Sequence, residues 1–197
     1  MNATQVVSSK PSKSRRYAAV KLFCAALILL GLGVVSLCAQ SNGVNAGGGW
    51  MMYENTDPMT GYKQARFMLQ ANNVLRDARE KAMVQIFCDH GHYKLGDFRP
   101  NGRLGRPEFP GFWGQPQMRV FVRVDDRHFH RDWNWVRGNF LSMDKGTVRG
   151  LLSGQVFNVE FRTPRGAQIA EFSPAGLDMG RFEDACHLTP KKPLSED

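Results

Sequence analysis

The richest set of chemically active side chains lies at positions 128–132, which read His-Phe-His-Arg-Asp. In an extended strand the side chains of His128, His130 and Asp132 point to one face, because successive side chains alternate between faces. Two imidazoles and a carboxylate form a familiar metal-ligand set. The same residues are also typical of a polar edge strand, whose charges prevent pairing with another chain. A metal-dependent enzyme using these three residues is therefore kept as the alternative hypothesis.

Aromatic side chains form a second group that could carry function. Rings on a loop rich in proline and glycine, such as 99–116, can stack on glycans, peptides or a partner protein. The other interpretation is that the rings plug the ends of a β domain. The rings concerned belong to Phe109, Phe112, Trp113, Trp133 and Trp135. Guanidinium groups that could add contacts to anions belong to Arg103, Arg106, Arg131 and Arg137.

Other catalytic patterns have little support in the sequence. No serine lies in the Gly-x-Ser-x-Gly context of a serine hydrolase. Arg123 and Asp125 fall on the same face of a predicted strand, which indicates a structural ion pair. The main prediction is therefore a protein without catalytic residues and without a cofactor.

Two cysteines, Cys88 and Cys186, lie outside the apolar N-terminal stretch. In an exported domain two cysteines are best interpreted as one disulfide, although two separate buried thiols are the alternative. Both are followed by histidines, but neither belongs to a C-x-x-C pair, so a zinc site is not expected.

The N-terminal segment 1–39 has the features of a signal for export. Its first 21 residues are polar and basic, and residues 22–39 carry no charge. A basic stretch followed by an apolar stretch is typical of a secretory signal, and 18 apolar residues also suffice to span a bilayer. Cleavage after Ala39, an uncleaved anchor in the inner membrane, and lipid attachment at Cys38 all stay open. The predicted location is the periplasm, with membrane contact through 22–39 if the segment is retained.

The net charge of +8 comes largely from this segment, which holds five basic residues and no acidic ones. The rest of the chain carries 21 basic and 18 acidic residues, a net charge of +3. Such a mild excess gives little support for nucleic-acid binding, and no nucleic-acid partner is expected.

Alternation of apolar and polar residues predicts β structure after position 50. The clearest case is 117–125, where Met118, Val120, Val122 and Val124 share one face. Strands are predicted over 50–54, 63–70, 83–88, 93–98, 117–125, 128–136, 139–143, 156–162 and 167–172. The segment 63–70 is also compatible with a helix.

Two short helices are also predicted. Asp144 is suited to cap a helix over 145–152 that ends at Gly154. Ser173 and Pro174 are suited to begin a second helix that runs to about Cys186, with proline in its first turn.

These elements predict a mainly β fold, a single antiparallel β-sandwich or open barrel with one or two short helices. The domain is expected over 50–188, after a flexible Gly/Asn/Ser linker over 40–49 and before a disordered tail over 189–197. Apolar residues make up 42% of the chain and charged residues 22%, which is ordinary globular composition.

The order of motifs resembles a family of exported proteins. A tryptophan near the domain start is followed by an Asp-Pro turn, a strand that ends in cysteine, an Arg-x-Asp strand and a second tryptophan. The residues that carry the resemblance are Trp50, Asp57, Cys88, Arg123, Asp125, Trp133, Leu151, Leu152, Phe172, Gly176, Leu177, Ala185 and Cys186. The chain is similar in these positions to periplasmic proteins of the TagO/VasI type. The family's Gly-Trp-like end is replaced by His187-Leu188, and the 99–116 insert is longer here.

The resemblance implies a non-catalytic accessory of type VI secretion. The sequence thus predicts a binding or accessory module whose partner is an envelope protein or glycan.

Overall fold

The structure, a computed structural model, describes residues 43–76 and 78–190. The predicted export segment 1–39 and the end of the tail, 191–197, lie outside the described residues. Within the described part, eleven strands and two short helices are formed, which confirms the mainly antiparallel β class. No helix of the described part has the length and apolarity needed to cross a bilayer.

The strands follow the chain in a sequence of hairpins. They are β1 (Val44–Asn45), β2 (Trp50–Thr56), β3 (Lys63–Gln70), β4 (Met83–Asp89), β5 (His92–Arg99), β6 (Phe109–Pro110), β7 (Pro116–Val124), β8 (Arg127–Val136), β9 (Phe140–Met143), β10 (Phe157–Thr163) and β11 (Gly166–Phe172). The helices are α2 (Lys145–Ser153) and α3 (Met179–Cys186).

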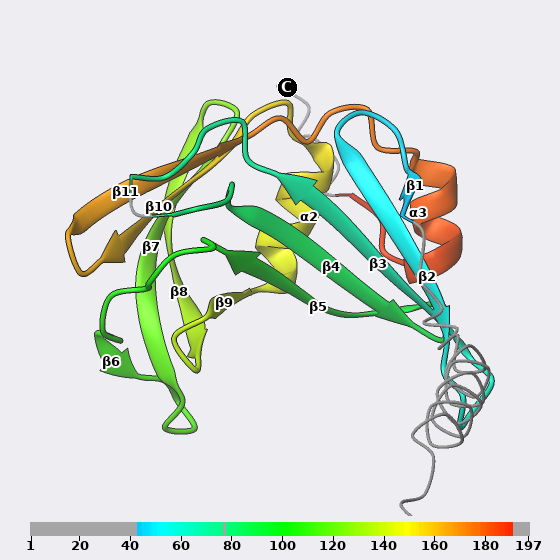
Figure 1. Cartoon of the computed structure of the whole chain (residues 1–197), viewed down its shortest axis with the longest axis horizontal. Coiled ribbons are helices and arrows are strands. Elements are labelled where there is room, and N and C mark those ends of the chain that lie inside the picture. Colours follow the sequence, from blue (N-terminus) through cyan, green and yellow to red (C-terminus); the bar gives the residue numbers. More distant parts are fainter. Residues whose placement is uncertain (1–42, 77, 191–197) are drawn as a thin grey trace, which may run out of the picture. The chain divides into compact units, whose positions relative to one another are not determined.

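All described strands belong to one antiparallel sheet with the order β1-β2-β3-β4-β5-β9-β8-β7-β10-β11, and β6 pairs with β7 (Figure 1). The sheet is not closed, because its two end strands, β1 and β11, do not pair with each other. The fold is therefore a single bent sheet. It is not the sandwich of two separate sheets that was one of the two predicted architectures.

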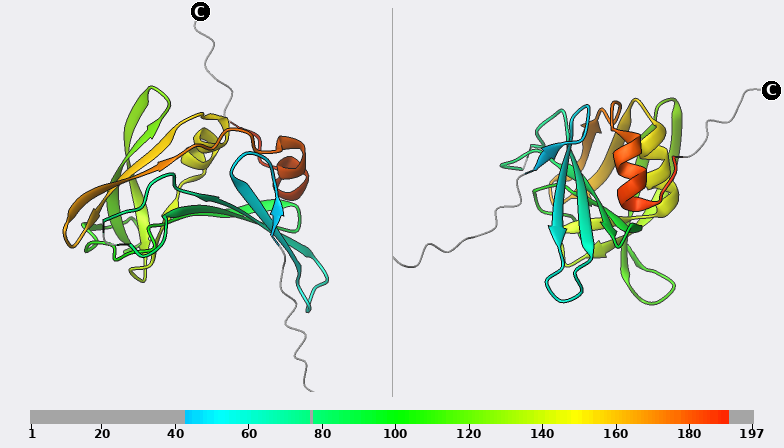
Figure 2. Two further views of the ribbon diagram at one scale, coloured as in Figure 1. Left: turned by 45° about the horizontal axis from the view of Figure 1, so that its top comes forward. Right: turned by 90° about the vertical axis from the view of Figure 1, so that its right-hand side faces the viewer.

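Helix α2 lies between the half of the bent sheet that contains β5 and the half that contains β7 (Figures 1 and 2). Its Val148 and Leu151 are fully buried in the core. A β-carbon at Gly96 of β5 would lie 2.5 Å from a methyl carbon of Val148, so only glycine lets the helix approach this strand. Gly154, which follows α2, packs against the other half of the sheet: a β-carbon there would lie 2.9 Å from Val124 of β7. The two halves of the sheet thus share one core with α2.

Helix α3 is fixed to the sheet by a disulfide and by aromatic packing. Cys186 at its end is bonded to Cys88 of β4, with the two Cα atoms 5.1 Å apart. Phe182 packs edge-on against Phe67 of β3 at 4.9 Å between ring centroids. The predicted pairing of the two cysteines is confirmed.

The start of α3 differs from the prediction. The helix begins at Met179, capped by Asp178, and not at Pro174. The carbonyl of Pro174 accepts a hydrogen bond from the indole nitrogen of Trp50 at 2.8 Å, and Gly176 has a φ of +89°. A helix cannot include that left-handed residue, so the segment before Asp178 is an ordered connection.

Residues 43–49, which the sequence assigns to a linker, are also part of the fold. Val44 and Asn45 pair with β2, and Ala46 and Trp50 are completely buried. A β-carbon at Gly47 would fall 2.2 Å from the carbonyl oxygen of Gly176. The glycines of this stretch therefore serve close packing against the connection before α3.

The free edge of β11 is covered by the loop between β3 and β4. The backbone N–H of Asn72 donates to the carbonyl of Glu171 at 2.6 Å, and the Asn73 side chain pairs with backbone groups of Ile169 and Glu171. Because these backbone groups are already bonded, this part of the edge is not available for pairing with another chain.

Candidate binding face

The side chains of β8, β7, β10 and β11 that point away from the core form a continuous face. In β7 the even-numbered residues from Met118 to Val124 are buried, as predicted, and the odd-numbered ones point outward. Strand register then places His130 beside Phe121, Phe121 beside Glu160, and Glu160 beside Ile169. We call the following residues the outer face: Arg119, Phe121, Arg123, His128, His130, Asp132, Asn158, Glu160, Arg162, Ala167 and Ile169.

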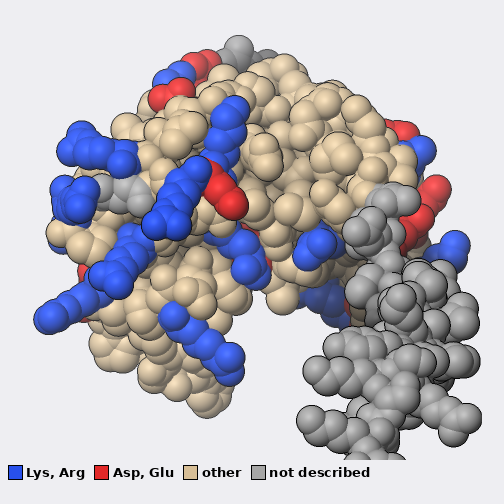
Figure 3. Space-filling view, viewed as in Figure 1, with Lys and Arg blue, Asp and Glu red and all other residues tan. Residues whose placement is uncertain are grey.

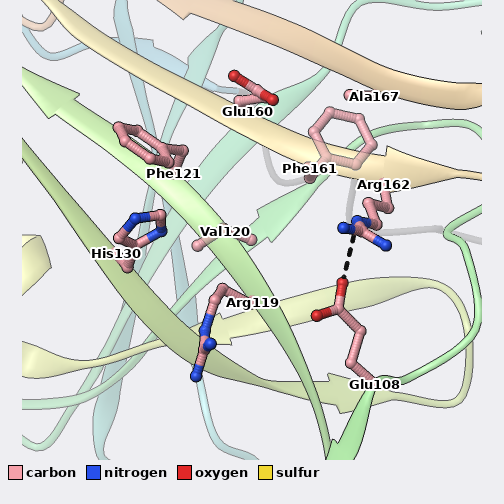
Figure 4. A pocket seen from close by; sticks show the side chains of 9 residues that line it. All are labelled: Glu108, Arg119, Val120, Phe121, His130, Glu160, Phe161, Arg162 and Ala167. Atoms are coloured by element: carbon pink, nitrogen blue, oxygen red, sulfur yellow. Dashed lines mark ion pairs between the residues drawn. The ribbon is translucent and has the colours of Figure 1, made fainter.

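A hollow of about 220 Å³ opens in the outer face where β7 and β10 separate (Figure 4). Their pairing ends at Phe121 and Glu160. Beyond that point the segment 104–108 enters between them: Gly105 donates to the carbonyl of Arg162, and Glu108 donates to that of Gln117, both at 2.8 Å. The hollow therefore results from a local opening of the sheet.

Two guanidinium groups flank this hollow. Arg162 forms an ion pair with Glu108 at 3.2 Å (Figure 4). Arg119 forms one with Asp132 at 2.9 Å. The hydrogen bond and the charge of Asp132 raise the pKa of Arg119 above its ordinary value. Guanidinium groups form paired hydrogen bonds with carboxylates and phosphates, so this part of the face can contact such a group on a partner.

An exposed aromatic ring lies next to these charges. Phe121 is 40% exposed, and its ring meets that of His130 edge-on at 4.1 Å. A second hollow of about 210 Å³ continues from Phe121 along Arg123 and His128. Such a mixture of rings and charged groups suits recognition of a side chain or a sugar better than covalent chemistry.

The predicted metal ligands His128, His130 and Asp132 all lie on the outer face. Residues two apart in a strand have Cα atoms about 6.5 Å apart, so these side chains would have to turn toward one another to share one metal ion. Asp132 is already paired with Arg119. Among residues 43–76 and 78–190, no three His, Cys, Asp or Glu side chains are grouped so that they could hold a metal ion.

The most exposed of the predicted aromatic residues are Phe112 and Trp113. They occupy the loop between β6 and β7 and are 91% and 81% exposed. Their rings meet edge-on at 4.9 Å. The backbone N–H of Gly111 donates to the carbonyl of Gln115 at 2.7 Å, so the loop has a defined turn.

The other predicted binding residues are less accessible. Trp133 is buried and belongs to the core, which corrects its assignment to a binding surface. Trp135 is half-buried, and its indole donates to the carbonyl of Gly105 at 3.0 Å. Phe109 is half-buried under the guanidinium of Arg119, 5.1 Å from the ring centroid. Arg131 is exposed and lies over Phe129.

Asp144 connects the buried tryptophan to α2. Partial burial acts to raise its pKa, but hydrogen bonds from Thr147 and Trp133 and the charge of Arg131 outweigh burial and lower the pKa below its ordinary value. As predicted, Asp144 is the N-cap of this helix.

The predicted ion pair between Arg123 and Asp125 does not form. Arg123 donates instead to the main-chain carbonyl of Asp125 at 2.7 Å. The Asp125 carboxylate accepts the backbone N–H groups of Gln155 and Val156. Asp125 has a φ of +53°, which turns its side chain toward the chain after α2 and away from Arg123.

The sequence did not single out Glu108, Glu160 or Arg162, which line the hollow. Strand alternation assigns Arg119 to an outward face. The residues are brought together only by the register between β7 and β10 and by the segment 104–108 that bonds to both strands beyond it.

No family model, curated protein or solved structure gives a significant match to this chain. The resemblance to TagO/VasI-type proteins therefore stays a prediction.

Proposed function

We propose that residues 43–190 form a non-catalytic binding module that acts outside the cytoplasm, as an accessory of an envelope or secretion assembly. Its partner is an envelope protein or glycan, which it contacts through the β6–β7 loop and the adjacent outer face. The type VI secretion role suggested by the resemblance is part of this proposal.

The observation that carries the proposal is the exposure of Phe112 and Trp113. Two large apolar rings side by side in water are unfavourable unless a partner covers them. Tryptophan in particular is enriched among the residues that dominate binding at protein interfaces. The guanidinium of Arg119, which lies over Phe109 at the start of the same hairpin, adds a group that can contact anions on the same partner.

The disulfide supports the proposed location of the domain outside the cytoplasm. Cys88 and Cys186 are joined across 98 positions of sequence, and such bonds persist in oxidising compartments. The export segment expected over 1–39 agrees with this placement.

A pull-down tests the proposal. The full chain serves as bait in envelope extracts, beside the double variant Phe112→Ala/Trp113→Ala. One defined partner should be recovered with the unchanged chain and lost with the double variant.

The matched control is Met59→Ala in the β2–β3 turn, because Met59 is as exposed as Phe112. This variant should retain the partner. Equal recovery by all three baits would argue against the loop as a binding site.

A further inference from the structure

Three segments that are distant in sequence meet at one end of the bent sheet. They are 78–81 before β4, 103–108 after β5, and 162–165 at the β10–β11 hairpin. Asn101, just before the second segment, donates its side-chain amide to the carbonyl of Lys81 at 2.6 Å, and Gly105 donates to the carbonyl of Arg162 at 2.8 Å. We call these three segments together the basic end.

The basic end concentrates the positive charge of the domain. The three segments hold six basic and two acidic residues, a net charge of +4. Residues 40–197 as a whole carry only +3, so everything outside the basic end has a net charge of −1. A nearly neutral domain thus has one strongly positive region.

The positive groups of the basic end face solvent. Figure 3 shows Lys and Arg side chains gathered on the left half of the view, over the β10–β11 hairpin and the neighbouring loops. Arg79, Arg103 and Arg106 are exposed. Glu108, by contrast, is already engaged by Arg162.

The junction of the three segments has little room for an enclosed ligand. Where they meet, the hollow lined by Leu75, Arg103 and Thr163 has a volume of only about 10 Å³. That volume is about what one water molecule needs, and it is too small for a phosphate group or a sugar ring. Exposed charges on the tips of separate loops suit an extended charged surface better than an enclosed ligand.

We propose that the basic end docks the domain on the headgroups of an anionic phospholipid bilayer. Several Lys and Arg side chains on separate loops can contact several headgroups at once, and each contributes to attraction that salt screens. The expected N-terminal segment would bring the domain close to such a surface. This inference goes beyond the proposed function. The basic end shares only Arg162 with the outer face and does not include Phe112 or Trp113, so either proposal can fail alone.

Vesicle binding tests the proposal. The test uses the fragment 41–197, because the apolar stretch 22–39 would bind lipid by itself. The fragment holds the whole described core, from Ala46 to Leu188, and both bridged cysteines. Its co-sedimentation is measured with phosphatidylglycerol-containing vesicles and with pure phosphatidylcholine vesicles, at low and high salt.

The fragment should bind the anionic vesicles at low salt, dissociate at high salt, and ignore the neutral ones. Arg103→Glu/Arg106→Glu should weaken binding by about 25-fold or more, since each basic side chain at an anionic surface is worth about fivefold in affinity. The control pair Arg127→Glu/Arg149→Glu changes the net charge equally at exposed sites outside the basic end. It should weaken binding far less.

Three results would overturn the proposal. One is no salt-sensitive binding of the unchanged fragment to anionic vesicles. Another is an equal loss in both variant pairs, which would indicate net charge alone. The third is binding to a soluble anionic polysaccharide without binding to vesicles, which would assign the basic end to a polymer. Matched melting temperatures of the variants exclude unfolding as the cause.

Discussion

At the start of α2, one carboxylate holds both a helix and a core residue. Asp144 accepts hydrogen bonds from the backbone N–H of Thr147 at 2.9 Å, from its hydroxyl at 2.6 Å, and from the indole of Trp133 at 3.3 Å. The cap could be predicted from sequence, because Asp before an apolar helical run is a local signal. The bond to Trp133 depends on how β8 lies against the helix, which no local signal reveals.

Replacing Asp144 by alanine should lower the free energy of unfolding by about 1 kcal/mol at neutral pH, since the helix loses its cap. The pKa of Asp144 is lowered in the folded state, so its stabilisation is present above the unfolded pKa of about 4 and is lost as pH falls through the folded pKa. Urea unfolding at neutral and acidic pH measures both effects.

Asp144→Asn is the matched control, because asparagine also caps helices. It should be less harmful than alanine. A loss for Asp144→Ala that is unchanged at acidic pH would contradict this role of the carboxylate.

At the scale of elements, regular alternation predicted most of the sheet. The hairpin of β10 and β11 was expected, and the segment 63–70, which was compatible with a strand or a helix, forms β3. The strands β1 and β6 were missed because a strand of two residues is too short to show an alternating pattern. The beginning of α3 was misplaced because the indole of Trp50 and the left-handed Gly176 act from outside the local pattern.

The approach of α2 to β5 gives a test at this scale. Gly96→Ala should lower the free energy of unfolding by about 1–3 kcal/mol, because the new methyl group would collide with the buried, stiff side chain of Val148. Thermal and denaturant unfolding of the purified domain measure the change.

Gly180→Ala provides a comparison within α3, where the added methyl group meets no atom closer than 3.5 Å. Stability there should stay the same or rise by up to about 1 kcal/mol, since alanine favours the helix. If Gly96→Ala is equally harmless, α2 does not pack against β5 as described.

At the scale of the whole domain, the β class of the fold could be predicted from sequence. Whether the strands form one open sheet or two packed sheets could not. Periodicity assigns residues to strands, but it does not say which strands pair, so a sandwich and an open barrel were both compatible with it. The outer face depends on the same long-range register. Its His128, His130 and Asp132 were identified from sequence, whereas their neighbours Glu160 and Arg162 were not.

The disulfide also acts at this scale, because it ties the last helix to the middle of the sheet. In the fragment 41–197, Cys88→Ser should lower the free energy of unfolding by up to about 4–5 kcal/mol on the chain-entropy account of a long closed loop. The variant should resemble the reduced wild type. A wild type whose stability is the same with and without reductant would show that the bond does not contribute.

The central claim is that the β6–β7 loop contacts a partner, and photo-crosslinking tests it most directly. A photoreactive residue is placed at position 113, or at position 59 as the control, in cells that naturally produce the chain. The account predicts one defined crosslinked product from position 113 and none from position 59. The same diffuse products from both positions, or none from either, would contradict it.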